Sequence, residues 1–309
     1  MRILARNPEL RKTKICRLFE LHPHKEKGTR MPRVSVLTPI YRTDASHLRE
    51  CIDSILNQTF TDFEFLILND SPDATYLRDI VKSYGDKRIK YIENDHNMGI
   101  SASRNKLLKM ARGEYIAIFD HDDISVPTRL MQQVEFLDAN PNIGVVSGWL
   151  QYFGDKNSIE KKPEWDTDIK ICMTRVCCVP HTASMIRKSV LIANNIEYEG
   201  YYSPAEDYRL WARLMDVTNF HNLQTVLVKY RWLATNTTNQ QYPKMERASD
   251  AISTQLRNKY PAYYADYVKY FCDKTRFRLR LFGKIPLIKI KNNWVQLFEF
   301  IPLFKIKWR

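Results

Sequence analysis

The sequence predicts an α/β fold with a mostly parallel sheet and helices on both faces. Strand-like and helix-like patterns alternate four times between residues 34 and 123, which implies right-handed crossovers between parallel strands. A second observation is the apolar run 115–119, which ends in Asp120, Asp122 and Asp123. Such a run is typical of a buried strand that brings polar groups to a sheet edge.

The predicted strands are short apolar runs, each followed by a helical pattern or a turn. The helical patterns have apolar residues three or four positions apart, as on one face of a helix. A further helix is expected to open at residues 205–207, and the run 182–187 resembles a strand. The expected strands are 34–39, 63–68, 89–92 and 115–119, and the helices lie near 48–56, 77–84, 101–111 and 130–137.

Polar residues follow three of these strands. Pro39 and Tyr41 come after the first, Asp70 after the second, and Asp120 and Asp122 after the fourth. Ligands of open α/β sheets collect beyond the carboxyl ends of the strands, so function is expected there. Two carboxylates so spaced can bind Mg²⁺ or Mn²⁺ and leave positions for phosphate oxygens. An acidic turn in water is the alternative, because so short a motif occurs freely.

An acidic site of this kind fits a haloacid-dehalogenase-like phosphatase or a non-catalytic nucleotide-binding or nucleic-acid-binding protein. The phosphatase leaves Asp70, and the acid Asp207 further along the chain, unexplained. The chain has no Gly-x-Gly-x-x-Gly after the first strand and no Gly-Lys-Ser/Thr loop, which disfavours a dinucleotide oxidoreductase and a P-loop nucleotidase.

The charge of +13 is concentrated at the two ends of the 309-residue chain. Residues 1–33 carry ten Lys and Arg against three acids, and residues 274–309 carry ten against one. The middle, 34–273, therefore has a net charge of −3. This distribution argues against a nucleic-acid groove in the main domain and places any anionic partner at the termini.

The six cysteines show no Cys-x-x-Cys spacing, and most lie among apolar residues, so reduced structural thiols are expected. No stretch approaches the roughly 18–20 apolar residues that span a bilayer. The first residues contain no uninterrupted apolar region that would indicate a secretory signal. A cytoplasmic protein is expected. Residues 1–30 fit a short amphipathic helix or a loose arm equally well, and Met31 is an alternative start.

Five motifs follow one another along the chain, namely 34–41, Asn69-Asp70, 97–99 with Arg104-Asn105, 120–123 and 206–211. In this order they resemble the family 2 glycosyltransferases, which are inverting enzymes of the GT-A fold that use nucleotide sugars. The resemblance covers roughly residues 34–240 and implies a Rossmann-like catalytic domain. We expect a basic arm at 1–33, a catalytic domain at 34–245 with a nucleotide-sugar half (34–125) and an acceptor half (126–245), and a helical, basic tail at 246–309.

The resemblance implies a role for each matching residue. Pro39, Tyr41 and Asp70 would surround the nucleobase and ribose, and Arg104 would help to hold the nucleotide. Asp120 would be the ribose-side acid and Asp122 the main ligand of Mn²⁺ or Mg²⁺, with Asp120 beside it. Asp123 is expected to cap the following helix; the alternative is that it supports the metal-binding residues. The acceptor-side candidates are His181, Trp211 and Arg231; His181 could equally be a structural histidine.

Asp207 is the candidate catalytic base, with Glu206 beside it. Inversion at an anomeric carbon needs a base on the face opposite the leaving group, to take the proton of the acceptor hydroxyl. The alternative is that both acids only complement the dipole of a helix N-terminus.

Two departures from the family pattern narrow the expected function. Leu233 lies near the position where many relatives have a histidine that contributes to the metal or diphosphate. Val228 replaces the Gln of the Gln-x-x-Arg-Trp motif of processive synthases, and their membrane spans are absent from the sequence. A transferase of single sugars is therefore favoured over a polymerase.

The tail contains a repeat of eleven residues. Residues 281–291 recur sixteen positions later as 297–307, with eight of eleven positions identical. Aromatic and aliphatic residues interleaved with Lys and Arg suit an anionic membrane surface, and similar tails occur in bacterial transferases that build lipopolysaccharide or capsule. The expected partners are thus a nucleotide sugar, a glycan or lipid-linked glycan acceptor and the inner face of the membrane, with no nucleic acid. A hairpin packed on the catalytic domain is the alternative for the tail.

Overall fold

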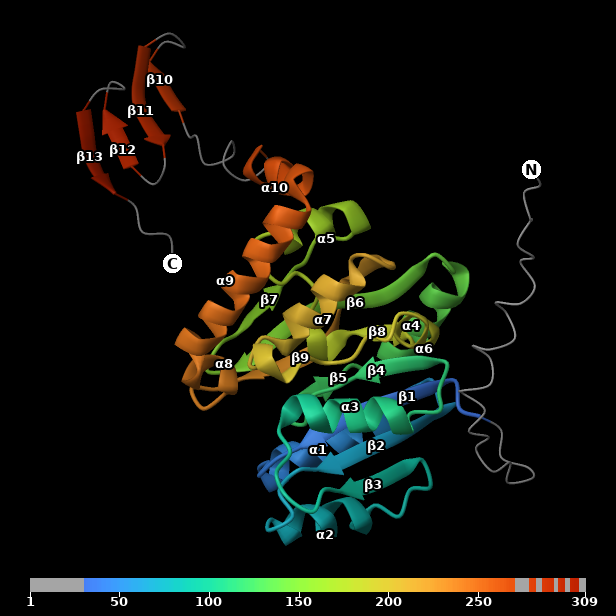
Figure 1. Cartoon of the computed structure of the whole chain (residues 1–309). Helices are drawn as coiled ribbons and strands as arrows, with labels where there is room; N and C mark the ends of the chain where they lie inside the picture. The colour runs from blue at the N-terminus through green and yellow to red at the C-terminus, as the bar shows by residue number, and fades with distance from the viewer. Residues whose placement is uncertain (1–30, 270–277, 282–284, 292–293, 298–300, 306–309) are drawn as a thin grey trace, which may run out of the picture. The chain divides into compact units, whose positions relative to one another are not determined.

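The computed structural model describes residues 31–269, 278–281, 285–291, 294–297 and 301–305 (Figure 1). The arm expected at residues 1–30 lies outside the described residues. The first half of the main sheet alternates strand and helix as expected, which confirms the α/β fold. Its elements are β1 (Val34–Ile40), α1 (Ala45–Leu56), β2 (Phe63–Asn69), α2 (Thr75–Ser83), β3 (Ile89–Glu93), α3 (Ile100–Met110) and β4 (Tyr115–Ile118).

The second half completes the sheet and adds helices around it. Its strands are β5 (Ile124–Ser125), β6 (Ile143–Gly154), β7 (Ser158–Glu160), β8 (Met185–Arg187) and β9 (Asn219–Trp232). Its helices are α4 (Arg129–Ala139), α5 (Asp166–Met173), α6 (Lys188–Ala193), α7 (Glu206–Leu214), α8 (Thr237–Gln240), α9 (Tyr242–Lys259) and α10 (Pro261–Tyr267). Short 3₁₀ segments lie at His181–Ala183 and Gly200–Tyr202.

These strands form one sheet in the order β3-β2-β1-β4-β8-β6-β9-β5, with β7 paired to β6. The first four strands are parallel, and β6 is parallel to β9. By contrast, β5, β7 and β8 pair antiparallel with their neighbours. The run expected as a strand at 182–187 is a 3₁₀ turn followed by the three residues of β8, which join the two parallel groups.

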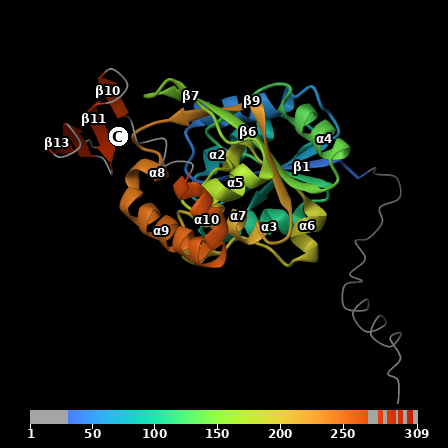
Figure 2. The ribbon, with the colours of Figure 1, turned by 90° about the horizontal axis from the view of Figure 1, so that it is seen from above.

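Two apolar cores lie on the two faces of this sheet, as alternation along the strands requires. In β4, Ile116 and Ile118 belong to one core, whereas Tyr115 and Ala117 belong to the other. The first core includes buried residues of α3, α5, α7 and α9, and the second includes those of α1, α2 and α4. Figure 2 shows α3, α7 and α9 on one side of the strands and α4 on the other. Helix α9 continues past residue 245, the expected end of the catalytic domain, and contributes Ile252 and Leu256 to the first core. This helix is therefore part of the packed domain.

The repeated sequence of the tail forms two equivalent hairpins. Strands β10 (Arg278–Leu281), β11 (Ile285–Lys291), β12 (Trp294–Leu297) and β13 (Ile301–Lys305) make an antiparallel sheet in that order. Arg278 pairs with Lys289, and sixteen residues later Trp294 pairs with Lys305. The register irregularity also recurs at the same place. In the described part of the chain, no helix is long and apolar enough to cross a membrane.

Gly113 sits where the chain enters β4 against β1. A Cβ atom added there would lie 2.5 Å from the backbone nitrogen of Ser35, so the parallel pair β1–β4 would have to shift. We expect Gly113→Ala to lower the free energy of unfolding by about 1–3 kcal/mol, measured by urea denaturation. The control is Gly200→Ala, whose Cβ would meet its nearest atom at 3.7 Å and should change stability by less than about 0.5 kcal/mol. Equal effects of the two substitutions would contradict this account.

Candidate functional site

A cavity of about 810 Å³ opens at the carboxyl ends of the parallel strands. It brings together most of the residues predicted from the sequence, although they come from distant parts of the chain. Those in its wall are Pro39, Tyr41, Asp70, Arg104, Asp120, Asp122, His181, Glu206 and Asp207.

Arg104, on α3, bridges two acids across the cavity wall. Its guanidinium donates to Asp120 Oδ1 at 3.0 Å and to Glu206 Oε1 at 2.7 Å. Burial by itself would lower the pKa of Arg104, but the charges of Asp120 and Glu206 outweigh burial and raise it. Arg104 is therefore a permanent cation that connects the end of β4 to the start of α7.

The turn after β4 is held by Arg231, at the end of β9. The Arg231 side chain donates to the backbone oxygen of Asp122 at 2.9 Å, and its amide donates to Asp123 Oδ1 at 2.9 Å. It also pairs with Glu50. Arg231 thus acts on the turn and is not among the residues that line the cavity; its contact with the acceptor stays a prediction.

Asp123 is fully buried and does not cap a helix. The next helix, α4, begins at Arg129 after Thr128, and strand β5 intervenes. The capping prediction was therefore wrong. Burial raises the pKa of Asp123, and the charges of Asp122 and Asp120 add to this rise.

The carboxylates of Asp120 and Asp122 are the donors available for a divalent cation. Nowhere in the described ranges are three or more His, Cys, Asp or Glu side chains grouped to hold a metal ion, and Leu233 lines the cavity. Two carboxylates suit Mg²⁺ or Mn²⁺ when substrate phosphate oxygens supply further ligands. The two carboxylates therefore fit a metal ion whose remaining ligands are oxygens of a diphosphate.

Asp70 organises the loop before α3. Its carboxylate accepts from the amides of Met98 (2.8 Å) and Gly99 (2.9 Å) and from the side chain of Asn94 (2.7 Å). Gly99 has a φ of +83°, a backbone conformation that favours glycine. Asp70 therefore shapes the cavity wall as well as lining it, whereas Tyr41 is 47% exposed at the rim.

Asp207 lies in the first turn of α7 and faces the same cavity. Burial raises its pKa to about 6, helped by the neighbouring charge of Glu206 and opposed by the bond from the Tyr208 amide and by Arg104. A carboxylate with a pKa near 6 is mostly ionised at pH 7 and accepts a proton more readily than an ordinary Asp. Glu206, in contrast, is paired with Arg104.

His181 is neutral in this environment. Burial lowers its pKa well below the usual range, and the charges of Arg104 and Arg129 add to this effect. Its Nε2 lies 2.9 Å from the Tyr198 hydroxyl. Trp211, its neighbour on α7, is fully buried in the core. The prediction that Trp211 contacts the acceptor was wrong, because its side chain points into the packed interior.

Several residues of the cavity wall were missed by the sequence analysis, namely Tyr152, Glu160, Lys162 and Cys177. They come from β6, β7, the segment between β7 and α5, and the loop after α5, where no motif distinguishes them.

The expectation that all cysteines are reduced was also wrong. Cys172 and Cys178 form a disulfide, since the turn after α5 brings their Cα atoms to 6.3 Å, within the range that a disulfide spans. The Cys-x₅-Cys spacing was the available signal.

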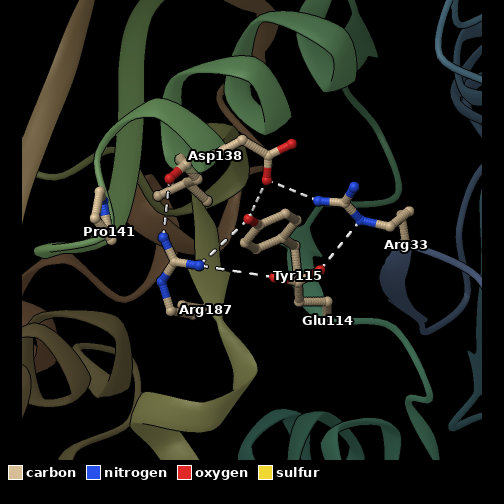
Figure 3. Close-up of a pocket in the computed structure, with 7 residues that line it drawn as sticks. Arg33, Glu114, Tyr115, Asp138, Pro141 and Arg187 are labelled. Atoms are coloured by element: carbon tan, nitrogen blue, oxygen red, sulfur yellow. Dashed lines mark hydrogen bonds and ion pairs between the residues drawn. The ribbon is translucent and has the colours of Figure 1, made fainter.

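A second hollow, of about 380 Å³, lies at the amino end of β4 (Figure 3). Arg33 and Arg187 flank the Tyr115 ring there. Arg33 pairs with Asp138 at 2.7 Å and with Glu114 at 3.1 Å, and Arg187 approaches Glu114 at 3.8 Å. The charges in this hollow compensate one another. The hollow is therefore a structural contact between neighbouring elements, at the end of the strands opposite the main cavity.

Comparison with known proteins agrees with this geometry. Residues 35–193 match the model of Glycosyl transferase family 2. An uncharacterized glycosyltransferase of Methanocaldococcus jannaschii is 35% identical over 207 residues, which is 65% of this chain and 71% of that protein.

Two solved structures share the fold. One is TarS of S. aureus in complex with UDP-GlcNAc, with a TM-score of 0.58, 20% identity and coverage of 74% of this chain and 72% of that one. The other is a mannosyltransferase of Pyrobaculum calidifontis in complex with GDP-Man and Mn²⁺, with a TM-score of 0.57, 16% identity and coverage of 79% and 72%. The matched family model, the similar sequence and the shared GT-A fold lead to one conclusion: the chain belongs to glycosyltransferase family 2.

Proposed function

We propose that the chain transfers a single sugar, with inversion, from a nucleotide sugar to a saccharide or lipid-linked acceptor. The nucleotide is proposed to be UDP, and the product to belong to a surface polysaccharide or lipopolysaccharide. The observation that carries the proposal is Asp207, a carboxylate with a pKa of about 6 in the same cavity as the paired acids Asp120 and Asp122. Membership of the family favours this function over the phosphatase alternative.

In this mechanism Asp207 accepts the proton of the acceptor hydroxyl as that oxygen bonds to the anomeric carbon and the diphosphate leaves. Arg104 and Glu206 hold the start of α7 against the end of β4, which keeps the base and the donor site in one arrangement. Holding the reacting groups in line supplies a large part of the rate enhancement.

Asp122, with Asp120, would hold a divalent cation. When bound, such a cation neutralises the charge that develops on the leaving diphosphate. The Mn²⁺ named with the similar mannosyltransferase supports this assignment. Arg231 contributes by fixing the backbone of Asp122.

The tail is proposed to hold the enzyme at an anionic membrane. Residues 275–309 carry nine Lys and Arg against one acid, with five Phe and two Trp interleaved. Each basic residue near an anionic leaflet contributes about 1 kcal/mol, and aromatic residues seat at the interface. A lipid-linked acceptor would then be concentrated beside the enzyme without any change in catalysis.

Asp207→Asn should lower transfer at least ~10²-fold, because a positioned base is lost, while leaving UDP binding nearly unchanged. In the wild type, kcat/KM should fall about tenfold per pH unit below a pKa near 6, since protonated Asp207 cannot accept a proton. The measurement is a pH profile of both proteins. Asp79→Asn, on the exposed side of α2, should keep the wild-type rate and profile. Near-normal turnover of Asp207→Asn would refute the assignment.

Asp122→Ala should abolish the metal-dependent part of UDP binding, because only Asp120 would remain as a carboxylate donor. Calorimetry with UDP, with and without Mn²⁺, measures this, and Asp95→Ala at an exposed position is the control. If the wild type binds UDP equally well without metal, the metal assignment is wrong.

Truncation after Lys274 should spare transfer to a soluble acceptor and abolish sedimentation with anionic liposomes. Binding of the full chain should weaken as salt rises, since screening reduces attraction between charges, and zwitterionic liposomes should bind neither form. The membrane assignment fails if the full chain ignores anionic liposomes at low salt, or if the truncated chain does not fold.

A further inference from the structure

The cavity that Asp207 lines also contains an ion pair that the proposed mechanism does not use. Lys162 Nζ lies 2.8 Å from Glu160 Oε1, and the Tyr152 hydroxyl donates to Glu160 Oε2 at 2.7 Å. All three residues line the cavity. The Lys162 side chain is only 17% exposed and that of Glu160 33%, so the pair is partly shielded from bulk water.

Cys177 connects this pair to the proposed base. Lys162 donates to the backbone oxygen of Cys177 at 3.5 Å. Burial raises the pKa of the Cys177 thiol, and the charges of Asp207 and Glu160 also raise it, while Lys162 opposes them. Cys177 is thus within electrostatic reach of both Asp207 and the ion pair, and all four residues line the same cavity.

The pair itself offers both donors and acceptors but no net charge. Burial alone would raise the pKa of Glu160, but Lys162, Tyr152 and Lys156 lower it below its ordinary value, so the carboxylate is ionised beside an ammonium. Lys156 lies over the rings of Tyr152 and Trp232, is exposed and is not among the residues that line the cavity. An ammonium has three donors and a carboxylate about four acceptor sites. The contacts above leave positions free on both, as a hydroxyl that donates and accepts would need.

Apolar residues flank these polar groups. Leu150 is the register partner of Glu160 in the β6–β7 pair, and Leu150, Val179 and Pro180 line the same cavity. A small set of polar groups in an apolar wall is typical of a site that fixes the orientation of one ligand. An anionic ligand would gain little here, because Glu160 already compensates the charge of Lys162.

We propose that Glu160, Lys162 and Tyr152 form the acceptor subsite and bind the hydroxyl groups of an uncharged sugar ring. One further hydroxyl of that ring would then be presented to Asp207. This inference rests on the proposed transferase function, and it adds the chemical class of the acceptor.

The test compares octyl glycosides as acceptor probes. Octyl glucoside, octyl galactoside and octyl N-acetylglucosaminide represent neutral rings, and octyl glucuronide represents an anionic one. Calorimetry is run with and without UDP or GDP on the wild type, Glu160→Gln and Lys162→Met. The control is Glu197→Gln, from an exposed ion pair with Lys109 at 3.7 Å, which has the same substitution outside the cavity.

The wild type should bind at least one neutral glycoside about tenfold more tightly than the glucuronide. Glu160→Gln should weaken that binding about tenfold, because an acceptor is lost, and should strengthen glucuronide binding, because Lys162 is left uncompensated. Lys162→Met should weaken neutral binding without the gain for glucuronide. Nucleotide binding should stay within twofold in every variant, and Glu197→Gln should match the wild type.

Three results would overturn the inference. They are a wild-type preference for glucuronide, no binding of any glycoside, or equal loss of nucleotide and glycoside binding in folded variants. Should Glu160→Gln fail to fold, Lys162→Met decides by the same criteria. Failure of the wild type to bind either nucleotide would count against the proposed function instead, and the titrations without nucleotide would still decide the acceptor subsite.

Discussion

The two-armed ion pair of Arg104 is the interaction on which the site depends. A guanidinium whose side chain is 10% exposed contacts Asp120, itself 28% exposed, and Glu206, 8% exposed. Without this cation, several acids would share one poorly solvated cavity and repel one another. With it, the end of β4 and the start of α7 are held together. Separating them would leave a buried charge without its partner, which is strongly destabilising.

The same pair explains why two adjacent acids have different roles. Glu206 and Asp207 are neighbours in the chain, yet only Glu206 is bonded to Arg104. Asp207 accepts a bond from its own Tyr208 amide, and burial raises its pKa to about 6. One acid therefore anchors the helix, and the other is left with the basicity that a proton acceptor needs.

The sequence predicted the first four strands and their helices because each is a local pattern of apolar residues. It also predicted that acids would gather at one sheet edge, and Asp70, Asp120 and Asp122 line the same cavity. The strand run at 182–187 was predicted less well. There, pairing of β8 with both β4 and β6 decides the structure, and such long-range pairing leaves no local periodicity.

The errors at Trp211 and Asp123 have one physical cause, and Arg231 shows the same ambiguity. Each residue type fits two environments equally well, and only the tertiary contacts distinguish them. An arginine at the end of β9 can face a ligand or bind the backbone of a neighbouring turn, and the oxygen of Asp122 lies 2.9 Å from its Nε. The ion pair of Glu160 and Lys162 shows the converse case. Two ordinary charged residues two positions apart become a site only because the β6–β7 hairpin places them in the cavity that also contains Asp207.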